Sequence, residues 1–220
     1  MCCAGHGLGM PSPPRRTNLE RFKDETLPGK VDEVEKAHPN AKVTVGCMDE
    51  HRVGLKPILR RVWTRKGVRP IAVVWHRFES IQVSAFVHPE TGENHWWLHD
   101  KVNTENFNHI LADFVRTVGA GEKHHFIMVL DGAGWHKAKK VEVPDGVHLV
   151  FLPPYSPELQ PAERLWSLSD EPLVNRCFAS LDELRSVQND RCVDLGDRRD
   201  EIRGRTLFHW WPAPTCATIL

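Results

Sequence analysis

The chain has 220 residues, of which 40% are hydrophobic and 26% are charged, and this suits one globular domain with at most a short appendage. A machine of several domains is therefore excluded. The longest apolar runs, such as residues 71–75, span about five residues, whereas a membrane-spanning helix needs about 20. An integral membrane protein is excluded as well. Basic and acidic residues balance at 29 each, so the overall charge does not indicate a nucleic-acid partner.

The amino terminus and the cysteines indicate the compartment. Residues 1–6 contain neither the basic region nor the apolar region of a secretory signal. The six cysteines are scattered along the chain and form no Cys-x-x-Cys pair, so we expect free thiols rather than a disulfide framework. Both features predict a cytoplasmic protein.

The first half of the chain is predicted to change from helix to strand near residue 40. Residues 1–17 are rich in Gly and Pro and are expected to lack regular structure, whereas residues 18–37 have the pattern of a broken helix, most regular over residues 30–37. Strands are expected after that point. The ranges predicted for them are residues 43–48, 71–78, 81–87 and 96–98.

The second half is predicted to alternate helix and strand. Apolar residues recur at intervals of three and four from Thr104 to Val118, and Gly119 follows as a helix stop. Residues 126–130 and 147–152 are continuous apolar runs, as expected of strands buried on both faces. Two further helices are expected, one after Pro161 and one over residues 181–195. The order of elements predicts an α/β fold with a central sheet covered by helices.

Three acidic residues each follow or open an apolar element: Asp49, Asp131 and Glu163. The ends of neighbouring strands meet at one edge of an open α/β sheet, so these acids are placed to converge. Converging carboxylates repel one another unless a cation lies between them, and Mg²⁺ or Mn²⁺ prefers such oxygen ligands. Two such ions suit phosphoryl transfer. The alternative is that the three residues are unrelated acids at strand ends and at a helix start.

Four segments of the sequence together resemble a known family. They are residues 48–57 (MDEHRVGLKP), 63–70 (WTRKGVRP), 130–136 (LDGAGWH) and 152–166 (LPPYSPELQPAERLW). Taken in this order, they resemble the DDE catalytic domain of bacterial insertion-sequence transposases of the six-thirty family, which belongs to the mariner superfamily. The resemblance covers roughly residues 40–210 and implies a ribonuclease H-like mixed sheet flanked by helices.

The resemblance also implies the site and the organisation of the chain. The family's metal triad falls on Asp49, Asp131 and Glu163, with Mg²⁺ or Mn²⁺ as the cofactor, and Glu50 and Glu158 are the nearest rivals for those roles. The chain then divides into a flexible leader with a short helix (residues 1–40), a catalytic core (41–170) and a helical extension of the same domain (171–220). Many relatives have Asn where this chain has Gly132, which puts a side-chain contact at that position in doubt.

A stretch without acids follows the first candidate ligand. Its basic residues are Arg52, Lys56, Arg60, Arg61, Arg65, Lys66 and Arg69. Because it begins just after Asp49, we expect it to contact the DNA backbone, although a solvated basic face is the alternative. We expect His136 either to touch the DNA or to orient a carboxylate. The other histidines, at 95, 99, 124 and 125, lack a matched Cys/His constellation and predict no zinc site.

These observations lead to a functional hypothesis. The resemblance implies a transposase catalytic domain that cleaves and joins DNA strands at transposon ends, in the bacterial cytoplasm and on the nucleoid. The expected partners are transposon ends, target DNA and a second copy of the chain on DNA. The 40 residues before the first strand are too few for the family's helix-turn-helix, so that module is expected to be missing or on a separate chain. A retired DNA-binding remnant and a ribonuclease H-like nuclease are the alternatives.

Overall fold

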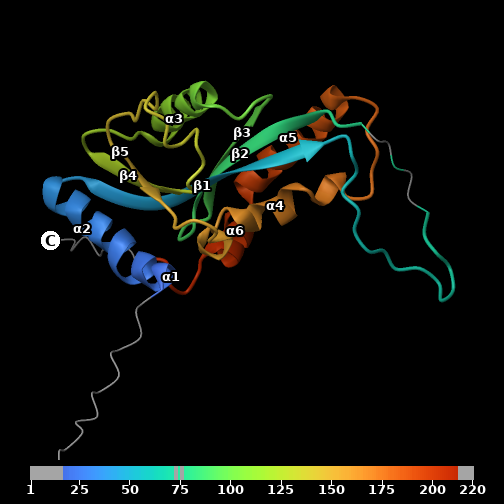
Figure 1. The fold of residues 1–220 in the computed structure, drawn as a ribbon, viewed down its shortest axis with the longest axis horizontal. Coiled ribbons are helices and arrows are strands. Elements are labelled where there is room, and N and C mark those ends of the chain that lie inside the picture. Colours follow the sequence, from blue (N-terminus) through green and yellow to red (C-terminus); the bar gives the residue numbers. More distant parts are fainter. Residues whose placement is uncertain (1–16, 72–73, 75–76, 213–220) are drawn as a thin grey trace, which may run out of the picture.

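A mixed sheet of five strands forms the centre of the protein in the order β3-β2-β1-β4-β5 (Figure 1). The computed structural model describes residues 17–71, 74 and 77–212. Its strands are β1 (Lys42–Gly54), β2 (Ser80–His88), β3 (Glu93–His99), β4 (His124–Leu130) and β5 (Val147–Phe151). The first three pair antiparallel, and β1, β4 and β5 pair parallel. The predicted α/β class with a mixed sheet is confirmed.

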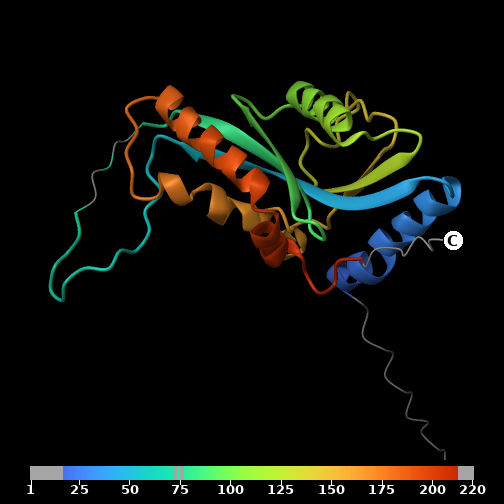
Figure 2. The ribbon, with the colours of Figure 1, turned by 180° about the vertical axis from the view of Figure 1, so that it is seen from behind.

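Helices cover both faces of this sheet (Figures 1 and 2). They are α1 (Asn18–Arg21), α2 (Leu27–Ala37), α3 (Thr104–Val118), α4 (Glu163–Ser169), α5 (Leu181–Asp197) and α6 (Arg199–Thr206). Helix α3 lies alone on one face, and the others lie on the opposite face. None of the helices in the described part of the chain combines the length and the apolarity that a bilayer crossing requires.

The single helix α3 packs through the apolar stripe that its sequence predicts. Phe107, Leu111 and Phe114 are buried against the residues of β1, β2 and β4 that face it. Asn103 caps the helix, because its side chain accepts the backbone N–H of Asn106 at 2.8 Å. The burial of three large side chains fixes α3 on its face of the sheet.

The N-terminal helical segment belongs to the core of the opposite face. The expected broken helix is confirmed: a π-helical turn, Phe22–Thr26, separates α1 from α2. Helix α2 begins at Leu27 rather than at residue 30, with a proline in its first turn, where the missing N–H is harmless. Phe22, Leu27 and Val34 are buried in the cluster that α4, α5 and α6 also enter. Residues 1–16 of the expected leader lie outside the described residues.

Strand β1 is longer than its sequence suggested. The apolar run was expected to end at Asp49, but β1 continues to Gly54. It has two successive partners: residues 42–47 pair parallel with β4, and residues 47–54 pair antiparallel with β2. The second pairing supports the polar half of the strand, which carries no apolar pattern of its own.

The expected strand over residues 71–78 is wrong wherever the structure describes it. Residues 71, 74, 77 and 78 have no strand conformation, and the other four lie outside the described residues. This apolar run pairs with no strand of the sheet at any of its described residues. It belongs instead to a long connection between β1 and β2, residues 55–79, which projects from the body of the protein (Figure 1). We call this connection the arm.

Two glycines with the same backbone conformation provide a test of the packing. Gly92 and Gly119 both have φ of 70°, but a Cβ on Gly92 would lie 1.9 Å from the carbonyl oxygen of Arg199, whereas a Cβ on Gly119 would meet nothing within 4 Å. Gly119→Ala should lose about 1–2 kcal/mol from left-handed strain alone. Gly92→Ala should lose clearly more, because β3 and α6 must also separate. Urea unfolding of both variants measures the difference, and equal losses would contradict this account.

Candidate active site

The three acids identified in the sequence line one cavity of about 360 Å³. Asp49 lies within β1, Asp131 follows the last residue of β4, and Glu163 is the first residue of α4. The parallel pairing of β1 with β4 ends at Cys47 and Val129. Continuing that register by two residues sets Asp49 beside Asp131 on the same face of the sheet. The topology thus places the first two acids together before any side-chain interaction is considered.

The proline-rich loop after β5 positions the third acid, Glu163, at the same cavity. The backbone N–H of Leu152 donates to the carbonyl oxygen of Leu130 at 2.8 Å, which extends the β4–β5 ladder to the base of the loop. Gln160 is buried, and its side-chain amide donates to the carbonyl oxygen of Met48 at 2.9 Å. This bond ties the loop to β1 one residue before Asp49. Helix α4 starts directly after it, so Glu163 faces the same cavity.

Asp49 is the buried member of the three, with 8% of its surface exposed. Burial raises its pKa to about 7, and the negative charges of Glu163 and Glu50 add to the rise. The indole Nε1–H of Trp166 donates to Asp49 Oδ2 at 3.0 Å, which opposes the shift and holds the carboxyl group in place. Trp166 lies one helical turn after Glu163. Helix α4 therefore supplies Glu163 itself and also the indole that binds Asp49.

His136 connects Asp131 with a fourth acid, Glu50. Its Nδ1 lies 2.9 Å from Asp131 Oδ1, and its Nε2 lies 3.0 Å from Glu50 Oε1. Burial by itself would lower the pKa of this imidazole, but the two hydrogen bonds and charges outweigh burial and raise it to about 9. The bond to His136 in turn lowers the pKa of Asp131. A protonated His136 therefore bridges the two carboxylates at neutral pH.

The indole of Trp135 competes for the same nitrogen of His136. Its Nε1–H lies 3.0 Å from Nε2. A protonated Nε2 is a donor with no lone pair to accept a second N–H, so the charged bond to Glu50 takes precedence. The side chain of His136 is fully buried and packs against Phe107, with ring centroids 4.5 Å apart and ring planes tilted by 54°. The contacts of His136 are those of a group that orients a carboxylate.

Two residues that sequence reasoning did not select also line the cavity: Lys137 and Tyr155. A Cβ on Gly132 would lie 2.8 Å from Lys137 Nζ, so the absence of a side chain at 132 leaves room for this ammonium group. The charge of Lys137 contributes to the lowered pKa of Asp131. Tyr155 has φ of 57° and is fully exposed. An exposed aromatic ring and a cation therefore accompany the acids.

The comparison with known families agrees with this arrangement. The sequence profile described as DDE superfamily endonuclease matches residues 44–185, well over half of the chain. The chain belongs to this family. A curated relative, the uncharacterized protein y4pE/y4sA of Sinorhizobium fredii, is 43% identical over 83 residues, which are 37% of this chain and 60% of that protein.

Solved structures identify the fold of this DDE endonuclease. A pre-cleavage Mos1 transpososome matches with a TM-score of 0.54 and 15% identity, over 94% of this chain and 68% of that one. The Mos1 transposase paired-end complex with the left transposon end matches with a TM-score of 0.51 and 16% identity, over 93% and 66%. The expected ribonuclease H-like fold is confirmed. The chain spans about two thirds of the length of these Mos1 chains.

The two rival acids of the endonuclease lie in different settings. Glu158 is exposed in a 3₁₀ turn, Pro157–Leu159, and does not line the cavity, although its neighbours Pro157 and Gln160 do. Glu50 points to the opposite face of the sheet from Asp49 and is bound to His136. Of the two, only Glu50 is connected to the three acids, and it is connected through a histidine.

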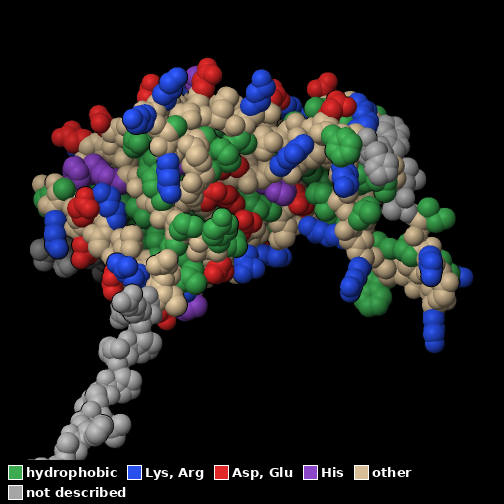
Figure 3. Space-filling view, viewed as in Figure 1, with side chains coloured by type: hydrophobic (Ala, Val, Ile, Leu, Met, Phe, Trp, Pro, Cys, Tyr) green, Lys and Arg blue, Asp and Glu red, His purple; other side chains and the backbone are tan. Residues whose placement is uncertain are grey.

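The basic stretch divides into anchored and free residues. Arg52 donates to the hydroxyl of Ser80 at 2.9 Å, and Arg60 donates to the carbonyl oxygen of Ser167 at 3.3 Å, so both are held at the root of the arm. The side chains of the remaining five make no hydrogen bond or ion pair with the described residues. They are Lys56, Arg61, Arg65, Lys66 and Arg69. Figure 3 shows Lys and Arg side chains pointing outward along the arm.

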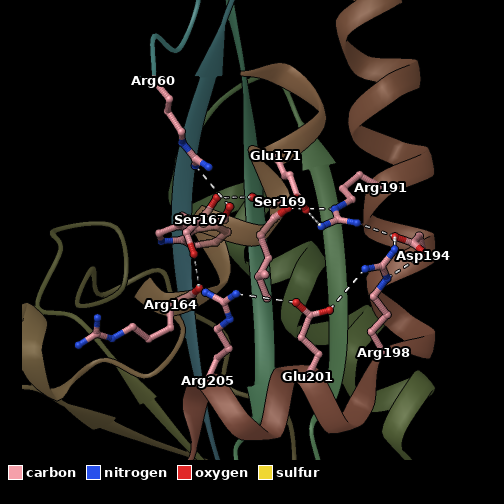
Figure 4. Close-up of polar contacts among 12 residues, drawn as sticks. Arg60, Arg164, Ser167, Ser169, Glu171, Arg191, Asp194, Arg198, Glu201 and Arg205 are labelled. Atoms are coloured by element: carbon pink, nitrogen blue, oxygen red, sulfur yellow. Dashed lines mark hydrogen bonds and ion pairs between the residues drawn. The ribbon is translucent and has the colours of Figure 1, made fainter. Parts of the chain in front are cut away.

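The arginines of the C-terminal helices are mostly neutralised. Figure 4 shows Arg191 paired with Glu171 and Asp194, and Arg198 paired with Asp194. Arg164, which directly follows Glu163, enters no ion pair among the described residues. Its guanidinium lies over the ring of Phe208, 5.7 Å from the centroid. Sequence reasoning missed Arg164, because only the structure shows which arginines already have a carboxylate partner.

The raised pKa of Asp49 predicts how the metal-free endonuclease responds to pH. The folded-state pKa of about 7 exceeds the ordinary value of 3.8, so the folded chain holds a proton that the unfolded chain releases. Stability should therefore fall as pH rises from about 4 to 7, by on the order of 4 kcal/mol. Asp49→Asn keeps an acceptor for Trp166 but cannot titrate, so its stability should fall less. Urea unfolding in EDTA across this range tests the point, and parallel curves for the two proteins would contradict it.

Proposed function

We propose that this endonuclease is a transposase catalytic domain that cleaves and joins DNA strands at transposon ends with the help of divalent metal ions. The observation that carries the proposal is the cavity lined by Asp49, Asp131 and Glu163 in a member of the DDE family. The Mos1 structures of the same fold are complexes of a transposase with transposon ends by their titles, which supports the choice of DNA as substrate.

The residues present fit Mg²⁺ or Mn²⁺. All three acids offer oxygen ligands, which these ions prefer. Asp49 has a raised pKa because its charge is buried near other carboxylates, and a cation is what would restore the ionised form. A Mos1 paired-end complex was solved with Mn, in line with this assignment. When bound, such ions activate the attacking oxygen and stabilise the leaving oxygen of a phosphodiester.

The other side chains of the cavity have proposed roles of their own. Trp166 and His136 hold Asp49 and Asp131 by one hydrogen bond each, which fixes the direction of the carboxylates. Lys137 places a positive charge beside the acids, where the scissile phosphate would lie. Tyr155 presents an exposed ring at the same cavity, suited to stacking on an unpaired base.

A nicking assay tests the catalytic proposal. Supercoiled plasmid incubated with the chain and Mn²⁺ should be nicked, and Asp131→Asn should reduce the rate by at least about 10³-fold, since several kcal/mol of metal stabilisation are removed. Glu158→Gln is the matched control, because this acid lies in the neighbouring loop but outside the cavity, and it should retain the rate. Equal losses in both variants would contradict the assignment. Cleavage of an RNA–DNA hybrid in preference to DNA would point to a ribonuclease H-like nuclease.

The arm is the proposed contact for the DNA backbone. Its five free cations leave the body of the protein together and have no acid among them. Apolar side chains of the arm are exposed as well: Trp63, which lies among these cations, is fully exposed, and Ile71, which follows them, is 95% exposed. Exposed aromatic and aliphatic groups on a projecting segment favour a protein contact in addition to DNA. We propose that this contact is with a second copy of the chain on paired DNA ends.

Sequence readout is a separate requirement. Backbone contacts position a protein on DNA, but base contacts select the sequence. We propose that a separate helix-turn-helix module supplies the base contacts. The share of the Mos1 chains that this chain spans, about two thirds, leaves room for such a module.

The free cations of the arm predict a salt dependence. Arg61, Arg65 and Lys66 changed together to Gln should flatten the slope of log affinity against log salt by about 2.7, because each phosphate that a cation neutralises contributes about 0.9 to the slope. The matched control removes three arginines that already face a carboxylate. These are Arg116, Arg185 and Arg198. Fluorescence anisotropy with duplex DNA at several salt concentrations measures both slopes, and the same flattening in both variants would show that only net charge matters.

A further inference from the structure

Three histidines from separate elements meet on the face of the sheet that α2 covers. His38 caps the end of α2, His125 lies near the start of β4, and His148 lies in β5. Each offers a ring nitrogen, and the three nitrogens lie within 4.8 Å of one another. Figure 3 shows histidine side chains gathered at the end of the protein where α2 meets β1. No sequence pattern indicates this cluster, because its members are separated by 87 and 23 positions.

The cluster is distinct from the acidic cavity. His125 lies near the start of β4, and Asp131 follows the last residue of that strand, six residues further along the chain. At about 3.3 Å per residue this separation is roughly 20 Å. The cavity of the acids is lined by residues from the other end of β4 and β5, and none of the three histidines lines it. Any role of this cluster is therefore independent of phosphoryl transfer.

The geometry inside the cluster suits coordination. His125 Nδ1 lies 3.0 Å from His148 Nε2, close to the spacing of about 3.3 Å between two nitrogens that each lie 2.0–2.1 Å from one tetrahedral zinc ion. The His38 ring stacks on His125, with centroids 3.8 Å apart. His38 is only partly buried at a helix end, so its ring can turn to direct a nitrogen at the same point.

Burial fixes the central histidine of the cluster. His125 is 96% buried, since 4% of it is exposed. Its ring has both partners as neighbours, with centroids 3.8 Å from His38 and 5.2 Å from His148. A shared ion would therefore lie at the buried side chain of His125, with the other two imidazoles directed toward it.

We propose that His38, His125 and His148 bind one zinc ion that fastens the end of α2 to β4 and β5. Three imidazoles select a borderline ion such as Zn²⁺ rather than Mg²⁺, which prefers oxygen. A water completes the tetrahedron on the exposed side. The ion ties a helix to two strands of the sheet, so its effect is on the stability of the fold. The expectation from the sequence that no zinc site exists is replaced by this proposal.

Metal analysis of the purified chain tests the site. After incubation with ZnCl₂ and desalting, the wild-type chain should retain one zinc per molecule, and His38→Gln and His148→Gln should retain none. His124→Gln is the matched control, because the neighbouring residue points to the opposite face and bonds to Thr44. It should keep the full equivalent. His38 is partly exposed, so its variant remains informative even if a change at His148 impairs folding.

A second part of the experiment distinguishes this site from the acidic cavity. Glu50, Asp131 and His136 also lie close enough to hold an ion. Zinc retained by Asp131→Asn but absent from His38→Gln supports the histidine site, whereas zinc absent from Asp131→Asn and kept by His38→Gln overturns it. Zinc at 100 times its dissociation constant should raise the Tm of the wild type by about 5–10 °C. No rise, or an equal rise in His38→Gln, also overturns the proposal.

Discussion

The repulsion among acidic side chains at the end of β1 and β4 is the constraint on which the candidate site depends. Asp49 is buried beside other carboxylates, so its pKa rises to about 7, while a hydrogen bond to His136 lowers the pKa of Asp131. The fold keeps these charges together with neutral and cationic neighbours: the indole of Trp166, the imidazole of His136 and the ammonium of Lys137. These neighbours offset part of the repulsion among the carboxylates.

Side chains on both faces of the sheet hold the acids in place, and each face does so through its own contacts. On the face of α4, the buried amide of Gln160 fixes the proline-rich loop to β1, and Trp166 reaches Asp49 from the first turns of the helix. On the face of α3, the ring of His136 packs against Phe107 and spans from Glu50 to Asp131. The positions of the acids are therefore set by two separate cores, and displacement of either layer would misdirect one carboxylate.

The basic side chains outside the cavity fall into two groups, those paired with carboxylates and those without such partners. Several arginines of the C-terminal layer face carboxylates: Arg191 pairs with Glu171 and Asp194, Arg198 with Asp194 and Glu201, and Arg205 with Glu201. The five free cations of the arm and Arg164 have no carboxylate partner among the described residues. A chain with zero net charge can in this way present a basic surface, because neutrality of the whole does not require neutrality of each region.

The sequence by itself determined the elements whose pattern is local and strong: the amphipathic α3, the buried strands β4 and β5, and the three acids, whose flanking motifs resemble a known family. It did not determine the length of β1, because the polar half of that strand is held by β2. Nor did it show that residues 71–78 lie in the connection between β1 and β2, because an apolar run does not by itself supply a pairing partner. Lys137, the bridge made by His136 and the meeting of His38 with His125 and His148 were decided only by the tertiary structure. Each depends on side chains that strand register and helix packing bring together. These residues lie far apart in the sequence, so no local pattern predicts their contact.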